Sequence, residues 1–219
     1  TRQKDYRDRP VAEKIVLATH NAGKIREFKS ILEPLGYEAV SVHDVMADIT
    51  EPEETGKTFA ENALLKATYY MKATGLPCLA DDSGIAADAL GGRPGVYSAR
   101  YVGLDCDDEA NNQKLIADLA AFPPEQWTVH YICSLVLIWP DGRIVTAEGS
   151  CDGVLRDFYA GDNGFGYDPL FYVPEKGKTM AEMTMEEKNA ISHLGKALKK
   201  LVEAWAGLRS ASAGSVTAR

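Results

Sequence analysis

The chain has 219 residues, of which 45% are hydrophobic and 26% are charged, a composition typical of a globular protein with a substantial core. Its net charge of −8 argues against a broad surface for nucleic acid or an acidic membrane, although a small polyphosphate can still bind through a divalent cation and local lysines. Four cysteines without C-x-x-C spacing favour buried free thiols in a reducing compartment over a zinc site. Without a signal peptide or a membrane-length apolar run, we expect a soluble, cytosolic protein.

Strands and helices are expected throughout the folded domain, which we place at 11–208, between a disordered extension at 1–10 and a disordered tail at 209–219. The expected elements, in chain order, are a strand at 14–19, a helix at 25–35, a strand at 37–42, an acidic connection at 45–55, a capped helix at 58–75, a strand at 76–80, a helix at 107–122, a hairpin with strands at 127–139 and 143–150, a glycine-rich loop at 161–169, a strand at 170–173 and a last helix with an apolar stripe at Leu194, Leu198, Leu201, Val202 and Trp205. Hairpin strands combined with strands separated by helices indicate a mixed α/β sheet.

Two adjacent carboxylates, Asp81 and Asp82, follow the strand at 76–80 and precede Ser83 and Gly84. A buried carboxylate needs a partner. Neighbouring side chains of an extended chain point to opposite faces, so the two acids are expected to have different roles. The alternative is a turn with solvated acids.

The loop at 19–24 joins a buried strand to a helix, and such a junction directs backbone N–H groups and a positive dipole at one spot, which suits an anion. Lys24, in the first helical turn, is unfavourable for the dipole unless an anion lies nearby. The alternative is a solvated lysine.

Other nucleotide-binding motifs fail on spacing. The two Gly-Lys-Thr triplets, at 56–58 and 177–179, lack the preceding glycine of a Walker A loop, and Pro169 replaces the third glycine of a dinucleotide fingerprint. Only four histidines are present, which argues against a histidine-rich metal site. The sequence favours an oxygen-ligated metal, most simply Mg²⁺ on carboxylates.

Three further stretches can carry chemistry or be structural. Asn62 and Lys66 share one helix face, as a solvated surface or as an edge facing phosphate. The loop at 164–169 combines glycines, two aromatic residues and a carboxylate, which suits stacking on a base or a loop tucked under the sheet. Lys188 and His193 can reach one ligand only if the helix breaks near Ser192, a plausible N-cap.

Taken together, the chain resembles the inosine/xanthosine triphosphate pyrophosphatase family of Ham-type dITP/XTP pyrophosphatases from about residue 14 to 201. The stretches that carry the resemblance occur in the same order: Thr19-His20-Asn21-Ala22-Gly23-Lys24, Glu53-Glu54-Thr55-Gly56, Glu61-Asn62-Ala63 with Lys66, Ala80-Asp81-Asp82-Ser83-Gly84, Leu90-Gly91-Gly92 with Pro94-Gly95 and Ser98-Ala99-Arg100, Gly164-Phe165-Gly166-Tyr167-Asp168-Pro169, and Glu187-Lys188 with Ile191-Ser192-His193.

The resemblance implies an elongated two-lobed α/β fold with a central mixed sheet, a nucleotide cleft between the lobes, and a homodimer. It implies Mg²⁺-dependent attack of water on the α-phosphorus of a deaminated purine nucleoside triphosphate, releasing the monophosphate and pyrophosphate. Asp82 would then be the catalytic base and a metal ligand, with Glu53 as the second metal ligand. The residues that would bind substrate are Thr19, His20, Asn21, Ala22, Gly23, Lys24, Lys66 and Ser83 at the triphosphate, and Phe165, Gly166, Tyr167, Asp168, Lys188 and His193 around the base and sugar.

One position departs from the family pattern, because Leu194 follows Ser192-His193 where the family usually has arginine. That arginine is a natural donor to the base, so we expect weaker base discrimination or a repositioned donor. The alternative is that Leu194 completes the apolar stripe of the last helix.

Two other functions stay open from the sequence. A Maf-like pyrophosphatase of other nucleotides shares the general architecture but is disfavoured by the Ser-His and Phe-Gly-Tyr-Asp stretches. A nucleotide-binding regulator without catalysis is disfavoured by the presence of Glu53, Asp82, Lys24 and Lys188.

Overall fold

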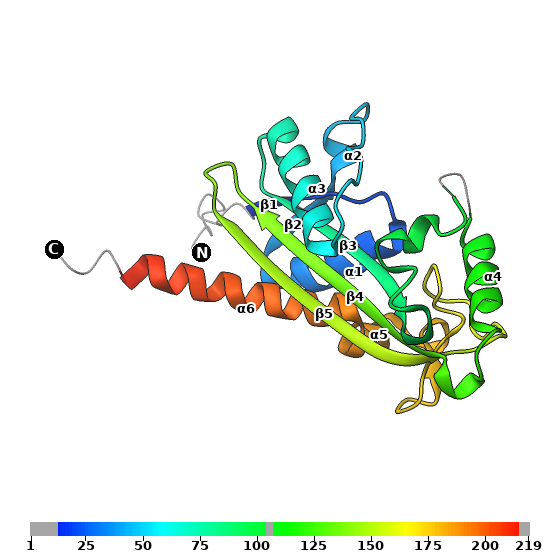
Figure 1. Cartoon of the computed structure of the whole chain (residues 1–219). Helices are drawn as coiled ribbons and strands as arrows, with labels where there is room; N and C mark the ends of the chain where they lie inside the picture. Colours follow the sequence, from blue (N-terminus) through cyan, green and yellow to red (C-terminus); the bar gives the residue numbers. More distant parts are fainter. Residues whose placement is uncertain (1–12, 104–106, 215–219) are drawn as a thin grey trace.

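The computed structural model describes residues 13–103 and 107–214, without the side chains of 209–214 (Figure 1). The expected extension at 1–10 and one of the four cysteines, Cys106, lie outside the described residues. The other three cysteines are buried free thiols, as expected. Within the described ranges, no helix combines the length and the apolar character needed to cross a membrane.

The main elements alternate as the sequence suggests. They are β1 (Glu13–Leu17), α1 (Ala22–Leu32), β2 (Tyr37–Ser41), α2 (Val42–Val45), α3 (Phe59–Thr74), β3 (Cys78–Ala87), a 3₁₀ segment (Gly95–Arg100), α4 (Asp108–Leu119), β4 (Thr128–Ile138), β5 (Ile144–Leu155), β6 (Phe171–Val173), β7 (Lys178–Thr179), α5 (Met185–Ile191) and α6 (His193–Gly214).

The seven strands form one mixed sheet in the order β2-β1-β3-β4-β5-β6-β7. β1 is parallel to β2 and β3, whereas the pairs from β3 to β7 are antiparallel. β3, β4 and β5 are long, and Figure 1 shows them running the length of an elongated molecule with α6 beside them. The predicted mixed α/β fold is confirmed.

Helices cover both faces of the sheet. α1 and α6 pack on one face, where Phe28 and Leu198 meet Leu79 and Leu135 in a buried cluster. α3 packs on the other, where Ala63 and neighbouring residues meet the alternate positions of β3 and β4. The apolar stripe of the last helix is buried as expected, with only Val202 partly exposed.

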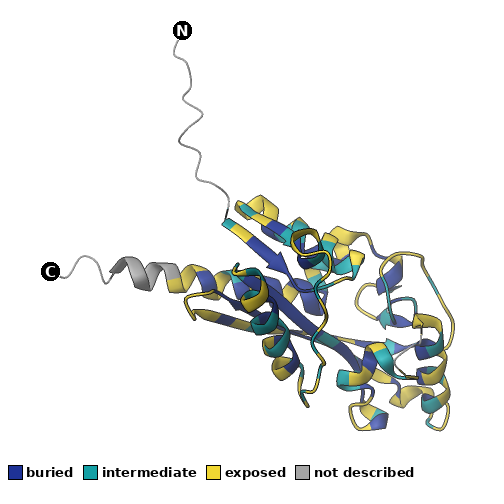
Figure 2. Ribbon diagram, turned by 90° about the horizontal axis from the view of Figure 1, so that it is seen from above, coloured by how far each residue is buried: buried dark blue, intermediate teal, exposed yellow. Residues whose placement is uncertain are grey.

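A second hydrophobic core lies around α4 and the far ends of β3 and β4. β3 contributes Leu79 to the first core and Ile85 to the second, so the polar stretch from Asp81 to Gly84 falls between the two cores. Figure 2 shows the buried residues concentrated along these strands, with exposed residues on the outer helix faces. This arrangement gives the two lobes that the resemblance implies.

Three predicted boundaries are wrong by five residues or more. The second hairpin strand, predicted at 143–150, continues to Leu155. The strand predicted to end at Ala80 continues to Ala87, because β4 pairs with it residue by residue from Cys78↔Ile138 to Ala87↔Val129. The last helix continues to Gly214, beyond residue 208 where we expected the folded domain to end.

Candidate nucleotide site

A cavity of about 140 Å³ lies between the two lobes, next to the polar part of β3. β1 pairs with β3 only at Cys78 and Leu79, so beyond Leu79 this edge of β3 faces the loop that enters α1. The cavity is lined by eight of the predicted site residues, namely Asn21, Lys24, Ser83, Phe165, Gly166, Tyr167, Asp168 and His193. Residues far apart in the sequence therefore meet at one position.

The loop before α1 is shaped by its own polar side chains. Asn21 is the N-cap, and its Oδ1 accepts hydrogen bonds from the backbone N–H groups of Gly23 (2.9 Å) and Lys24 (3.2 Å). Thr19 Oγ1 accepts a hydrogen bond from Asn21 N at 3.1 Å. Gly23 cannot carry a side chain here, since a Cβ atom would lie 2.7 Å from the ring of Phe165. The loop and the glycine-rich segment are thus in direct contact.

Asp81 faces α1. Its Oδ2 accepts hydrogen bonds from Lys24 Nζ (2.8 Å) and from Ser83 Oγ (3.1 Å), the residue two positions along the same face of β3. Burial lowers the pKa of Lys24, but the Asp81 carboxylate outweighs this effect and the pKa is raised to about 12. Burial raises the pKa of Asp81, but the charge of Lys24 outweighs this effect, and the pKa of Asp81 is lowered overall. Both groups are charged at neutral pH.

Asp82 faces α3, on the opposite side of the sheet. Its Oδ2 accepts a hydrogen bond from Asn62 Nδ2 at 3.1 Å, and Asn62 Oδ1 accepts one from Gly56 N at 2.7 Å. Burial raises the pKa of Asp82 to about 6; Lys66 opposes this and Glu54 adds to it. The two adjacent acids have the separate roles that the alternation of β3 predicts.

Glu54, rather than Glu53, is the glutamate that lies close to Asp82 and Lys66. Its carboxylate forms an ion pair with Lys66 at 3.0 Å, and its backbone carbonyl accepts a hydrogen bond from Arg100 at 3.3 Å. Glu53 is exposed. The sequence could not separate the two neighbours, because the choice depends on which one the chain turns toward Lys66.

Asp168 organises the glycine-rich loop and is buried. Its carboxylate accepts hydrogen bonds from Tyr131 OH (2.8 Å), Phe165 N (3.1 Å) and Lys188 Nζ (2.9 Å). Gly164 has a φ of +77°, and a Cβ atom there would lie 2.2 Å from Asp168 Oδ2. With these three donors, Asp168 shapes the loop from within.

Lys188 lies beneath the loop. Besides Asp168 it pairs with the buried Glu27 at 2.9 Å, and its ammonium lies 4.5 Å from the ring centroid of Phe165. Burial raises the pKa of Glu27 and Lys188 lowers it, with a net rise. Lys188 thus supports the loop that lines the cavity, although it does not line the cavity itself.

His193 lines the cavity as the first residue of α6. α5 ends at Ile191, and Ser192 Oγ caps α6 by accepting a hydrogen bond from Gly195 N at 2.9 Å, which confirms the predicted break. The His193 ring stacks on Tyr131 with centroids 4.6 Å apart. Burial, followed by the charge of Lys188, lowers the pKa of His193 to about 3, so the imidazole is neutral.

Two cavity-lining residues each have a buried polar atom without a hydrogen-bond partner in the described part of the chain, Asn112 Oδ1 and His193 Nδ1. Buried polar groups are normally paired, so atoms of this kind indicate a bound ligand or water. Asn112 was missed from the sequence. Two asparagines in the middle of a helix, Asn111 and Asn112, were the available signal, since asparagine is a poor helix former.

Leu194 is buried in the core between the sheet and α6, and it does not line the cavity. The structure therefore gives this residue the packing role that we considered as the alternative. Among the other predicted residues, Thr19, Ala22 and Gly23 lie in the loop and first turn of α1 beside the cavity, and His20 is exposed. Lys66 and Asp82 lie on the α3 side of the sheet and do not line the cavity.

The mixed α/β sheet has a cavity at the carboxyl end of β1, and carboxylates and lysines flank this cavity. These features define a protein that binds a small anionic ligand. Residues 15–204 match the Ham1 family, and the chain belongs to that family.

Similar proteins agree with this assignment. The chain is 53% identical to a dITP/XTP pyrophosphatase of Desulforamulus reducens over 190 residues, covering 87% of this chain and 94% of the relative. It is 50% identical to a dITP/XTP pyrophosphatase of Geobacter sulfurreducens over 197 residues, covering 89% and 98%. A solved structure of a HAM1 protein from Coxiella burnetii is similar with a TM-score of 0.80 at 38% identity, covering 89% of this chain and 99% of that one.

Proposed function

We propose that this protein hydrolyses deaminated purine nucleoside triphosphates, namely dITP, ITP and XTP, to the monophosphate and pyrophosphate. The observation that carries the proposal is Asp82, a buried carboxylate whose pKa is raised to about 6, one residue from the cavity-lining Ser83. A base with a pKa near the working pH is well suited to accept a proton from an attacking water. Relatives about 50% identical carry the name of this activity.

The triphosphate is assigned to the loop at 19–24, Ser83 and Lys66, which supply an N-terminal helix turn and lysines for the negative charge. Asp82 accepts the proton of the water that attacks the α-phosphorus, and Asn62 holds its carboxylate in place at 3.1 Å. The pairing of Lys24 with Asp81 keeps this ammonium charged beside the cavity.

Mg²⁺ fits the α3 side of β3. Asp82 and Glu54 both offer carboxylate oxygens, which Mg²⁺ prefers, and they are close enough for Glu54 to raise the pKa of Asp82. We assign the ion to these two residues; comparing Glu54→Gln with Glu53→Gln tests this choice against the glutamate expected from the resemblance. When bound, Mg²⁺ neutralises charge on the phosphates and makes a coordinated water more acidic.

The base is assigned to the cavity. A 6-oxo purine presents O6 as an acceptor beside an N1–H donor, and adenine presents the reverse. A donor and an acceptor in the cavity can therefore distinguish them, because a site built to hydrogen-bond one pattern is left with unpaired groups by the other. Asn112 Oδ1 and His193 Nδ1 are the available atoms. They are also our candidates for the repositioned recognition that the absence of arginine at Leu194 requires.

The test is release of pyrophosphate and monophosphate from ITP, XTP, dITP, GTP and ATP, with and without Mg²⁺. We expect Mg²⁺-dependent turnover of the first three above GTP and ATP, and a loss of about 10²–10⁴-fold in Asp82→Asn. Asp141→Asn, at an exposed turn of the β4–β5 hairpin, is the matched control and should keep full activity. Equal turnover of all five would reject the specificity, and binding without turnover would identify a regulator instead.

The assembly and the location follow from the same proposal. We infer a homodimer in the cytoplasm, where the nucleotide pool is found. Sedimentation equilibrium of the purified protein tests the dimer, and a monomer at micromolar concentration would contradict it.

A further inference from the structure

We propose that His20, His43 and Glu51 form a binding site for a divalent transition metal of the Zn²⁺ class, separate from the carboxylates assigned to Mg²⁺. Their ligand atoms all lie within 4.8 Å of one another. The sequence argued against a histidine-rich site because histidines are few, but the fold brings two of the four together. The site shares His20 with the loop at 19–24 to which the triphosphate is assigned, but it is argued from contacts that the proposed activity does not use.

The sheet explains why the two histidines meet. β1 and β2 are parallel neighbours that end side by side at Leu17↔Ser41. His20 follows the end of β1 by three residues, and His43 follows the end of β2 by two. Their ring centroids are 3.9 Å apart with the ring planes tilted by 31°, and the two Nε2 atoms are 3.2 Å from each other.

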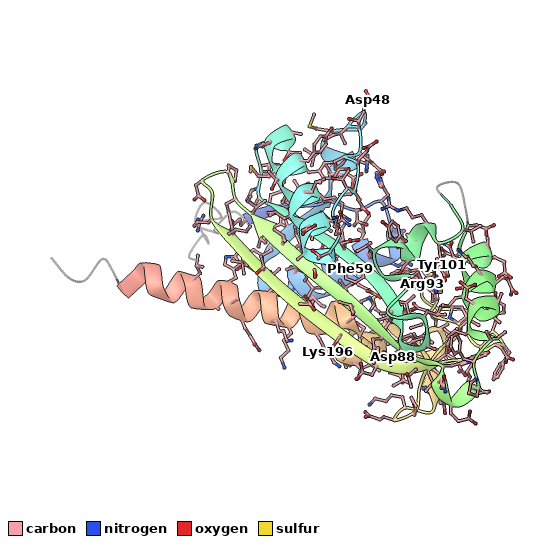
Figure 3. All side chains as sticks on the ribbon, viewed as in Figure 1. Asp48, Phe59, Asp88, Arg93, Tyr101 and Lys196 are labelled. Atoms are coloured by element: carbon pink, nitrogen blue, oxygen red, sulfur yellow. The ribbon has the colours of Figure 1, made fainter. Side chains whose placement is uncertain are left out.

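Glu51 completes the group from the segment between α2 and α3. Figure 3 shows Asp48 at the outer tip of this segment. The residue next to Glu51, Thr50, is fastened to α3 by a hydrogen bond between Thr50 Oγ1 and Tyr69 OH at 2.8 Å. The Glu51 carboxylate contacts His20 Nε2. All three ligands are therefore anchored to separate parts of the fold, so little rearrangement is needed for binding.

The contacts of His20 Nε2 cannot all be satisfied by hydrogen bonds, which favours a bound ion. His20 Nε2 contacts both the Glu51 carboxylate and His43 Nε2. If His20 Nε2 carries a proton, one hydrogen has to serve two acceptors; if it does not, its lone pair faces the carboxylate oxygen. A cation that accepts all three lone pairs removes this conflict.

The donor set selects the metal. Two imidazole nitrogens and one carboxylate oxygen suit Zn²⁺, Co²⁺ or Ni²⁺, whereas Mg²⁺ prefers an all-oxygen set. His20 and Glu51 are exposed, so an ion reaches the site from solution and open coordination positions remain for water. Such an ion ties the loop before α1 to the segment before α3.

The chain offers a matched control at His130. This histidine also contacts two carboxylates, but through opposite ring nitrogens: Nε2 with Asp88 at 2.8 Å and Nδ1 with Asp152 at 2.6 Å. Its ligand atoms diverge, so they do not form a chelate. Asp88 lies far from Asp48 in Figure 3, so the control is remote from the proposed site.

The experiment titrates Zn²⁺ into tag-free protein in excess Mg²⁺, by calorimetry and by melting temperature, with Co²⁺ absorption as a direct report on nitrogen ligation. We expect one Zn²⁺ per chain. His20→Gln, His43→Gln and Glu51→Gln should each weaken binding by more than about tenfold, because loss of a direct ligand costs at least as much as loss of a residue that only orients one.

His130→Gln should bind as the wild type does. A thermal shift with Zn²⁺ should be seen in the wild type and be lost in the three variants, since only a ligand that binds the folded state stabilises it. Unchanged Zn²⁺ affinity in those variants, an equal loss in His130→Gln, or a loss confined to Asp82→Asn would overturn the proposal.

Discussion

Asp81 and Asp82 are consecutive residues of β3 whose carboxylates lie on opposite faces of the sheet, one bonded to Lys24 and the other to Asn62. The strand alternation places them in different surroundings, and their pKa values move in opposite directions as a result. A single peptide unit thus separates a charged structural pair from an acid that titrates near pH 6.

The raised pKa of Asp82 predicts a stability effect. Because folding raises this pKa, the ionised group destabilises the protein above about pH 6, and the cost disappears as the pH falls toward the ordinary value for aspartate. Asp82→Asn should therefore be more stable than the wild type at pH 7, by at most about 3 kcal/mol, and equally stable near pH 4. Urea unfolding with a chelator present measures this difference.

Asp141→Asn is the control for that experiment, because Arg143 lowers the pKa of the exposed Asp141 and the stabilising sign should be absent. A wild type more stable than Asp82→Asn at pH 7 would contradict the assignment of a raised pKa.

Replacing Lys188 by an uncharged residue should cause a large loss of stability. It is buried between Glu27 and Asp168 at 2.9 Å from each, so Lys188→Met leaves two buried carboxylates without their cation. Removing one partner of a buried ion pair typically costs about 3–5 kcal/mol. Thermal or urea unfolding at pH 7 checks the loss, which should shrink in acid as the carboxylates become protonated.

A matched exposed pair separates burial from charge. Lys178 lies 3.1 Å from Glu187, and both side chains are 43% exposed. Lys178→Met should cost less than about 1 kcal/mol. Equal losses in the two methionine variants would show that burial is not the cause.

Asn112 predicts a change in base selectivity. Asn112 lines the cavity, its Oδ1 is buried, and its Nδ2 donates to Gly166 O at 3.2 Å. Asn112→Leu should lower the ratio of kcat/KM for ITP to that for ATP by about tenfold, the usual effect of one lost hydrogen bond in a buried site. Gln113→Leu, at the exposed neighbour on α4, should leave the ratio unchanged. An unaltered ratio in Asn112→Leu would exclude this residue from base recognition.

We expect the position of His193 to depend on the close approach of the α6 backbone to Gly149 of β5. A Cβ atom on Gly149 would lie 2.3 Å from His193 O and 2.6 Å from Ala197 N, both backbone atoms of α6. Gly149→Ala should destabilise the protein by about 1–3 kcal/mol, as overpacking does, and should raise the KM for ITP.

Gly207→Ala, within α6 itself, is the opposite case, since no neighbouring atom lies within 4 Å of the position of its Cβ. There, the better helix propensity of alanine should stabilise the protein by about 0.5–1 kcal/mol. A stable Gly149→Ala variant would show that α6 can shift away from β5 at little cost.

Much of this fold and site could be predicted because local chemistry agrees with the final structure. The apolar stripe of α6, the cap at Ser192 and the divergence of Asp81 from Asp82 each depend on residues close in sequence. The continuation of β3 past Asp82 could not be predicted, since Ser83 and Gly84 are typical of turns and the partner strand begins more than forty residues later. For the same reason, the sequence did not identify Asn112 as a cavity residue and did not separate Glu54 from Glu53.

The uninterrupted pairing of β3, β4 and β5 also limits how the substrate can enter. These ladders cross the boundary between the two cores without a break, from Cys78↔Ile138 to Ala87↔Val129 and from Thr128↔Val154 to Ile138↔Ile144. A hinge at this boundary would have to rupture several ladder hydrogen bonds at once. The cavity can therefore open only by movement of the loops on its rim, at 19–21 and 161–166. The strand that carries Asp82 keeps the same position relative to both lobes.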